Sequence, residues 1–172
     1  MHELSKKLAQ LIGVQPPPGH TWENKEDPET MTDWAVKWAN EGLYIFPCAR
    51  YLGEPMLNDW FKKATCDEDQ ICEWWGRWPE ADIGAVPSKS GHFVVAAFRD
   101  EGGIVSLDEL EEQHGKLPTE YRYHNNIGDE FLWLSGRAYT SHHRLGRGIH
   151  VLGKGHMVFL PASWAPHINY RS

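Results

Sequence analysis

The segment FVVAAFRDEGG, residues 93–103, has the apolar run, the break and the glycine pair of a strand that carries a metal site, but its apolar run lacks the acids that such a site needs. An apolar run leads to Asp100 and Glu101, and two glycines follow. Carboxylate oxygens are the ligands that hard cations such as Mg²⁺ prefer, and residues i and i+2 of a strand point to the same face. If the strand continues to Asp100, that face also carries Ala96 and Phe98, which cannot bind a metal. In the other interpretation, Asp100 and Glu101 begin a turn before the glycines.

A second group of side chains could contact phosphate. Acidic residues are absent from 131–172, and the candidates there for a local basic strip are Arg137, Arg144, Arg147 and Lys154. Lys and Arg that neutralise phosphates supply most of the strength of nucleic-acid binding. The alternative is a solvated loop with ordinary surface arginines. The net charge of −7, counted with His neutral, disfavours binding of nucleic acid by the surface as a whole.

Composition and motifs exclude several other classes of protein. The mean hydropathy of −0.56 and the 41% of hydrophobic residues are those of a globular protein. No apolar stretch is long enough to span a membrane, and the N-terminus lacks the apolar core of a signal peptide. We therefore expect a cytoplasmic protein with no membrane association. Neither a G-x-S-x-G elbow nor a phosphate loop before a helix is present.

The elements that must position these side chains follow from hydrophobic spacing and turn residues. Residues 1–29 read as an N-terminal helix with a proline-rich arm, and residues 30–172 as the globular domain. Helices are predicted early, with a mostly antiparallel sheet gathered late, which makes an α+β (α/β mixed) fold. The helices are expected at 32–42, 67–78 and 106–115, and the strands at 43–47, 82–87, 92–98, 119–125, 129–136, 148–153 and 156–161.

Four phrases together resemble a known family over about residues 30–170. They are EGLYIFPCA (41–49), ATCDEDQICEWWGRWPEADIGAVPS (64–88), SLDELEEQHGKLPTE (106–120) and GIHVLGKGHMVFLPAS (148–163). In this order they resemble the N-terminal domain of bifunctional DNA primase-polymerases, members of the archaeo-eukaryotic primase superfamily. The resemblance implies a primase-polymerase-like fold of two tightly joined subdomains. It also implies nucleotidyl transfer on two metal ions, which requires carboxylates.

The same resemblance places the family's functional positions on residues that cannot do this chemistry. The two metal aspartates fall on Ala96 and Phe98, the triphosphate-binding histidine on Glu130, and the third metal aspartate on His150. A lysine and an arginine of the family fall on Glu54 and Leu152. We therefore expect a catalytically inactive domain with no cofactor. It would act as a binding or regulatory module in DNA replication or mobile-element biology, with a protein partner.

An alternative keeps the enzyme. If Asp100 takes over the role of ligand, it would form a set of two carboxylates and an imidazole with Glu130 and His150. Such a set suits Mn²⁺ or Zn²⁺ better than Mg²⁺. The chain would then be a DNA-binding primase/polymerase that needs Mg²⁺ or Mn²⁺ at a relocated site.

Overall fold

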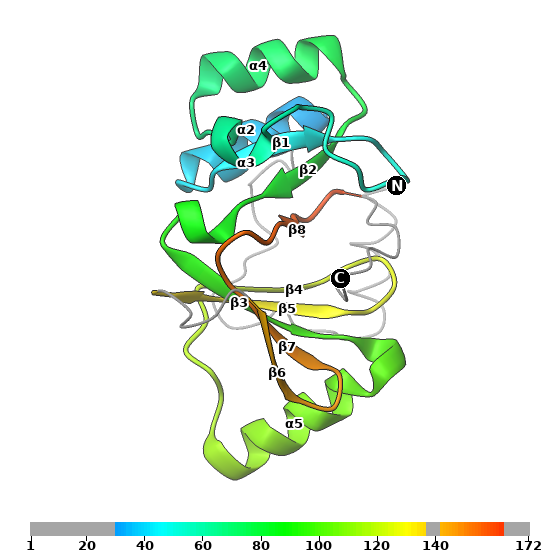
Figure 1. The fold of residues 1–172 in the computed structure, drawn as a ribbon. Helices are drawn as coiled ribbons and strands as arrows, with labels where there is room; N and C mark the ends of the chain where they lie inside the picture. The colour runs from blue at the N-terminus through cyan, green and yellow to red at the C-terminus, as the bar shows by residue number, and fades with distance from the viewer. Residues whose placement is uncertain (1–29, 137–141, 164–172) are drawn as a thin grey trace, which may run out of the picture.

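The computed structural model of the chain describes residues 30–136 and 142–163 (Figure 1). Its strands form two sheets, one with the order β1-β2-β8 and one with the order β4-β5-β3-β7-β6. Every strand pairing in them is antiparallel. The predicted α+β class is thus confirmed, with one sheet at the centre of each subdomain. No helix within the described residues combines the length and the apolar character that crossing a bilayer requires.

The smaller subdomain contains the three-stranded sheet and the helices beside it. Its elements are α2 (Met31–Asn40), β1 (Ile45–Cys48), α3 (Trp60–Lys63), α4 (Glu68–Arg77), β2 (Asp82–Ala85) and β8 (Val158–Phe159). Two helix starts are set by local side chains: Thr30 accepts a hydrogen bond from the Asp33 N–H, and Asp67 accepts one from the Gln70 N–H. Such caps satisfy N–H groups that have no partner inside the helix.

The larger subdomain is built around β3, its central strand, and α5 lies along its outer side (Figure 1). The short 3₁₀ helix η1 (Pro87–Lys89) joins it to β2. Its elements are β3 (His92–Ala97), the 3₁₀ helix η2 (Arg99–Glu101), α5 (Gly103–His114), β4 (Tyr121–His124), β5 (Glu130–Ser135), β6 (His142–Gly146) and β7 (Ile149–Leu152).

One apolar cluster extends through both subdomains. It includes Ala35 of α2, Ile83 of β2 and Ala96 of β3, all inaccessible to solvent. A separate cluster packs α5 against the other face of the five-stranded sheet through residues such as Val95 and Leu107. Because neighbouring strand residues point to opposite faces, β3 contributes to both clusters and separates the inside of the molecule from α5.

The structure differs from the predicted elements in several places. The last helix was expected at 106–115, but it begins at Gly103, and the Ser106 hydroxyl donates to the Gly102 carbonyl. The first strand continues one residue beyond Pro47. Instead of one late sheet, the early strands β1 and β2 form their own sheet with β8. Neither α3 nor β6 was predicted, because their residues have no clear apolar periodicity.

Candidate functional site

The strand β3 ends at Ala97, and the chain then turns through η2. Asp100 is exposed and lies in this turn, as the second interpretation of the segment predicted. Gly102 follows with φ of 79°, a left-handed conformation that favours glycine. The acids that follow the apolar run therefore leave the strand instead of extending its face.

Two glycines hold this turn against the loop between β6 and β7. The Gly148 carbonyl accepts a hydrogen bond of 2.8 Å from the Phe98 N–H, and the Phe98 carbonyl accepts one of 2.8 Å from the Gly103 N–H. A Cβ atom on Gly103 would lie only 2.2 Å from the Gly148 oxygen. Only a chain without side chains at both places can bring β7 this close to the end of β3.

Three positions that the resemblance assigns to metal ligands, Ala96, Phe98 and His150, lie on one face of the sheet. Ala96 pairs with His150 across β3 and β7, and Phe98 follows two residues later on the same face. The Phe98 and His150 rings are in edge contact, with centroids 5.0 Å apart, and both side chains are almost fully buried. The Nε2 atom of His150 lies 3.3 Å from the Glu101 Oε2 atom.

This face does not fit the pair of divalent ions that the resemblance implies. Hard cations need several oxygen ligands, whereas Ala96 and Phe98 offer none and His150 is directed at Glu101. Within residues 30–136 and 142–163, no three His, Cys, Asp or Glu side chains are placed so that they could hold a metal ion.

Glu130 lies on the other face of the sheet. It pairs with Ala97, not Ala96, so its carboxylate points toward α5. There it forms an ion pair with Arg122, whose guanidinium also contacts Glu111 of α5 at 2.9 Å. Burial lowers the pKa of Arg122, but hydrogen bonds from its guanidinium to the two carboxylates outweigh this, and the pKa is raised. The structure therefore does not bring Asp100, Glu130 and His150 together, because Glu130 and His150 lie on opposite faces of the sheet.

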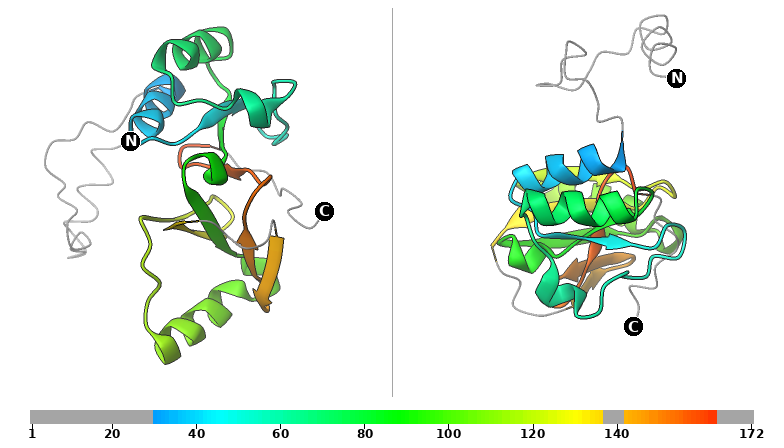
Figure 2. Two further views of the ribbon diagram at one scale, coloured as in Figure 1. Left: turned by 60° about the vertical axis from the view of Figure 1, so that its left-hand side comes forward. Right: turned by 90° about the horizontal axis from the view of Figure 1, so that it is seen from above.

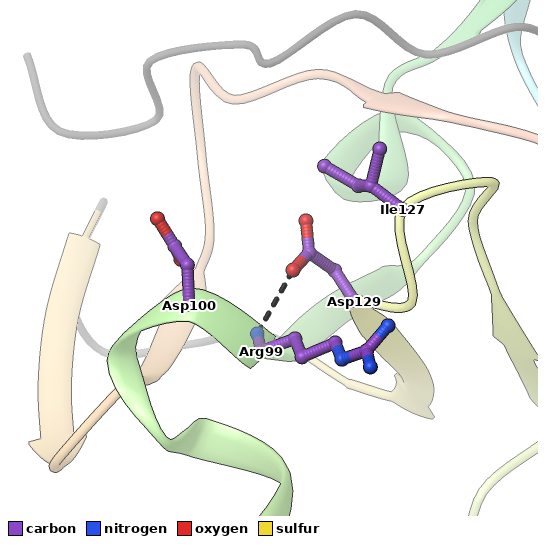
Figure 3. Close-up of a pocket in the computed structure, with 4 residues that line it drawn as sticks. All are labelled: Arg99, Asp100, Ile127 and Asp129. Carbon is purple, nitrogen blue, oxygen red and sulfur yellow. Dashed lines mark hydrogen bonds between the residues drawn. The ribbon is translucent and has the colours of Figure 1, made fainter.

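A pocket of about 270 Å³ lies at the end of β3, lined by Arg99, Asp100, Ile127 and Asp129 (Figure 3). Figure 3 shows the carboxylates of Asp100 and Asp129 on the same side of the η2 ribbon, although they come from different segments. Asp129 is 7% exposed and accepts hydrogen bonds from the Arg99 N–H at 2.9 Å and from the Asn125 amide at 3.2 Å. It thus holds the turn between β4 and β5 against η2. Asp129 was not among the residues predicted from the sequence, although the Asn-rich turn before it was an available signal.

The cationic candidates are only partly brought together. Arg144 and Arg147 are exposed on the β6–β7 hairpin, and both approach Glu101. The Arg144 Nη2 atom lies 3.9 Å from the Glu101 carboxylate, and the Arg147 Nε–H donates to the Glu101 carbonyl at 3.2 Å. Lys154 is exposed in the turn after β7. Arg137 lies outside the described residues.

Glu54 lies on the exposed loop that follows β1, where its carbonyl accepts a hydrogen bond from the Ala49 N–H. Leu152 is fully buried on β7 and belongs to the cluster shared by the two subdomains. Neither position presents a cation.

Comparison with known proteins adds one match. The model of a family described as bifunctional DNA primase/polymerase, N-terminal, matches residues 35–172. The match begins inside α2 and includes every strand of both sheets. No curated protein matches the chain.

Proposed function

The chain belongs to the family of N-terminal domains of bifunctional DNA primase/polymerases, and from this premise we propose that it has lost nucleotidyl transfer and acts as a binding or regulatory module in DNA replication or in the biology of a mobile element. One observation carries the proposal. The face of β3 and β7 that would present metal-binding aspartates presents a methyl group, a phenyl ring and an imidazole, packed together.

The packing of Phe98 supports this proposal more strongly than the change of residue type alone. Its ring is 7% exposed and packs against His150, so an apolar ring fills the position that the resemblance assigns to a metal ligand. Two-metal transfer depends on ions that clamp the attacking and the leaving oxygen. Ala96 and Phe98 supply no carboxylate on this face, so two of the ligands that such ions would need are missing there.

The test is nucleotide incorporation by the full chain on primed and unprimed single-stranded DNA, with Mg²⁺ or Mn²⁺. We expect no incorporation, and no rise of the melting temperature with millimolar metal and deoxynucleoside triphosphate, because a ligand stabilises only a native state that binds it. Incorporation that Asp100→Ala abolishes would overturn the proposal and restore the relocated metal site. The Ala96→Asp/Phe98→Asp variant tests whether the family's two aspartates are correctly assigned to positions 96 and 98. If this variant gains a metal-dependent rise of the melting temperature, the assignment is supported.

We propose that the principal partner is a protein, because the net charge of −7 opposes a nucleic-acid surface. DNA could still contact the hairpin that carries Arg144 and Arg147. In that case affinity for single-stranded DNA falls steeply with salt and drops in Arg144→Glu, whereas Lys154→Glu, in a different turn, has less effect. Binding that is absent, or insensitive to salt, leaves the protein partner as the remaining candidate. The expected cytoplasmic location belongs to the same proposal.

A further inference from the structure

Three aromatic side chains form a row where α2 meets the edge strand β4, and we call Trp34, Trp38 and Tyr121 the aromatic ladder. Trp34 and Trp38 are one helical turn apart and stack with ring centroids 6.2 Å apart. Trp38 meets Tyr121 edge to face at 6.1 Å. All three are partly exposed. In the view from above, α2 lies over the yellow strands (Figure 2), and the contact of Trp38 in α2 with Tyr121 in β4 bridges the two subdomains.

Contacts with the interior of the protein hold two rings of the ladder, those of Tyr121 and Trp38, in place. Tyr121 packs edge to face on Trp133, which is fully buried, with centroids 6.1 Å apart. The Trp38 indole N–H donates to the Pro161 carbonyl at 3.4 Å. Rings held in this way lose little conformational freedom when a ligand covers them, so the surface is pre-organised for binding.

The Tyr121 end of the ladder is negatively charged. Two exposed carboxylates stand there: the Tyr121 hydroxyl donates to Glu41 at 3.5 Å, and Glu120, which also contacts His92 at 2.7 Å, precedes Tyr121 in the chain. Burial and then these two carboxylates raise the pKa of Tyr121. At the other end the chain places its own cation, since the Lys37 Nζ atom lies 4.5 Å from the Trp34 ring centroid and 5.5 Å from that of Trp38. Indole faces attract cations, and this location already accommodates one.

We propose that the aromatic ladder binds an extended, proline-containing segment of a partner protein that carries a lysine or arginine beside the prolines. The inference rests on the proposed role as a binding module and names the chemistry of its partner. Proline-rich segments are extended before binding and dock on rows of aromatic rings at a low entropic cost. The carboxylates of Glu41 and Glu120 select the charge of the flanking residue, and the ligand's cation takes the place of Lys37 over the indoles.

The probe is a synthetic hexaproline peptide with a lysine at each end, titrated into the ¹⁵N-labelled full chain. We expect saturable shifts of the Trp34 and Trp38 indole N–H signals. The same peptide with glutamate at each end should bind about tenfold more weakly, because the carboxylates of Glu41 and Glu120 repel it. Lys37→Ala should strengthen binding about threefold by uncovering the indole faces.

A matched pair of substitutions distinguishes the effect of losing a ladder residue from the effect of losing any tryptophan. Trp34→Leu should abolish saturable binding, whereas Trp78→Leu should leave it unchanged. Trp78 is likewise partly buried and lies 4.8 Å from a cation, Arg77, but it has no place in the ladder. The indole N–H spectrum of each variant reports whether it remains folded. Equal loss in the two folded variants would contradict the assignment.

The chain's own prolines, Pro16, Pro17 and Pro18, lie outside the described residues and supply the last control. If the probe binds only when all three are changed to Ala, the occupant is the chain's own segment, and the assignment to a partner is overturned. Absence of binding to the parent and to this variant also overturns it. Nucleotide incorporation is measured separately: a chain that polymerises yet binds the probe refutes the proposed loss of catalysis and keeps this inference.

Discussion

Replacing Gly103 by alanine should destabilise the whole domain. The added methyl group would lie 2.2 Å from the Gly148 oxygen and 2.6 Å from the Phe98 nitrogen. Both are backbone atoms, and each takes part in a hydrogen bond that anchors η2. They cannot move away as the end of a flexible side chain could, so either the β6–β7 loop or the first turn of α5 must shift.

The size of the effect follows from two costs. Overpacking of a tight contact costs about 1–3 kcal/mol, and a buried backbone group that loses its partner costs about 1–3 kcal/mol more. The preference of helices for Ala over Gly returns only about 0.5–1 kcal/mol. A net loss of about 3 kcal/mol is expected, which lowers the melting temperature of a chain of this size by about 6–12 °C.

Urea and thermal unfolding of the full chain measure this loss, and Gly76→Ala is the matched control. Gly76 lies inside α4 with nothing within 4 Å of an added Cβ, so this variant should be more stable than the parent by about 0.5–1 kcal/mol. If Gly103→Ala loses less than about 1 kcal/mol, the close approach of β7 to the end of β3 is not what fixes η2, and the reasoning fails.

Three further predictions concern single side chains. Glu130→Gln should cost about 2 kcal/mol in urea unfolding, because Arg122 loses one of its two carboxylate partners. Glu80→Gln, at an ion pair whose acid is 78% exposed, should cost less than about 1 kcal/mol, and equal losses would contradict this. Hydrogen bonds from His92 and Ser135 lower the pKa of Glu120 from 4.5, so their stabilisation is present above that value and lost as the pH falls through the lower, folded-state pKa. Melting curves of Glu120→Gln and the parent should therefore converge in acid, and a constant gap would refute the assignment. Burial, and then the Asp82 carboxylate, raise the pKa of Cys48, so a thiol reagent should label the two exposed cysteines of the native chain and spare this one; three labelled thiols under native conditions would contradict it.

The parts of the fold that the sequence predicted are those set by neighbouring residues. The helical spacing of Ala35 and Trp38 and the cap at Asp67 are local, and α2 and α4 formed as expected. The start of α5 was misplaced because it depends on contact with Gly148, which is far away in the chain. The short helix α3 begins after Asp59. This residue has a left-handed conformation and its side chain makes no cap, so no local sequence pattern predicts the helix.

The candidate site shows the same division. Residues two apart on a strand share a face, so Ala96 and Phe98 could be placed together from sequence, and pairing with β7 adds His150 to them. The grouping of Glu130 with Asp100 and His150 was wrong because the sequence does not fix the register of a strand. A shift of one residue moves a side chain to the opposite face, and β5 presents Phe131, not Glu130, beside Ala96.

The apolar cluster that runs through both subdomains has a mechanical consequence. Its members come from elements of the smaller subdomain (α2, β1 and β2) and of the larger one (β3, β5 and β7). The two subdomains therefore behave as one rigid unit. A hinge motion that separated the two subdomains would disrupt the close-packed apolar cluster that stabilises both of them. Such a rigid molecule holds a bound ligand in one geometry. The occupancy of its binding surface is then set by the concentration of the ligand and not by a conformational change of the protein.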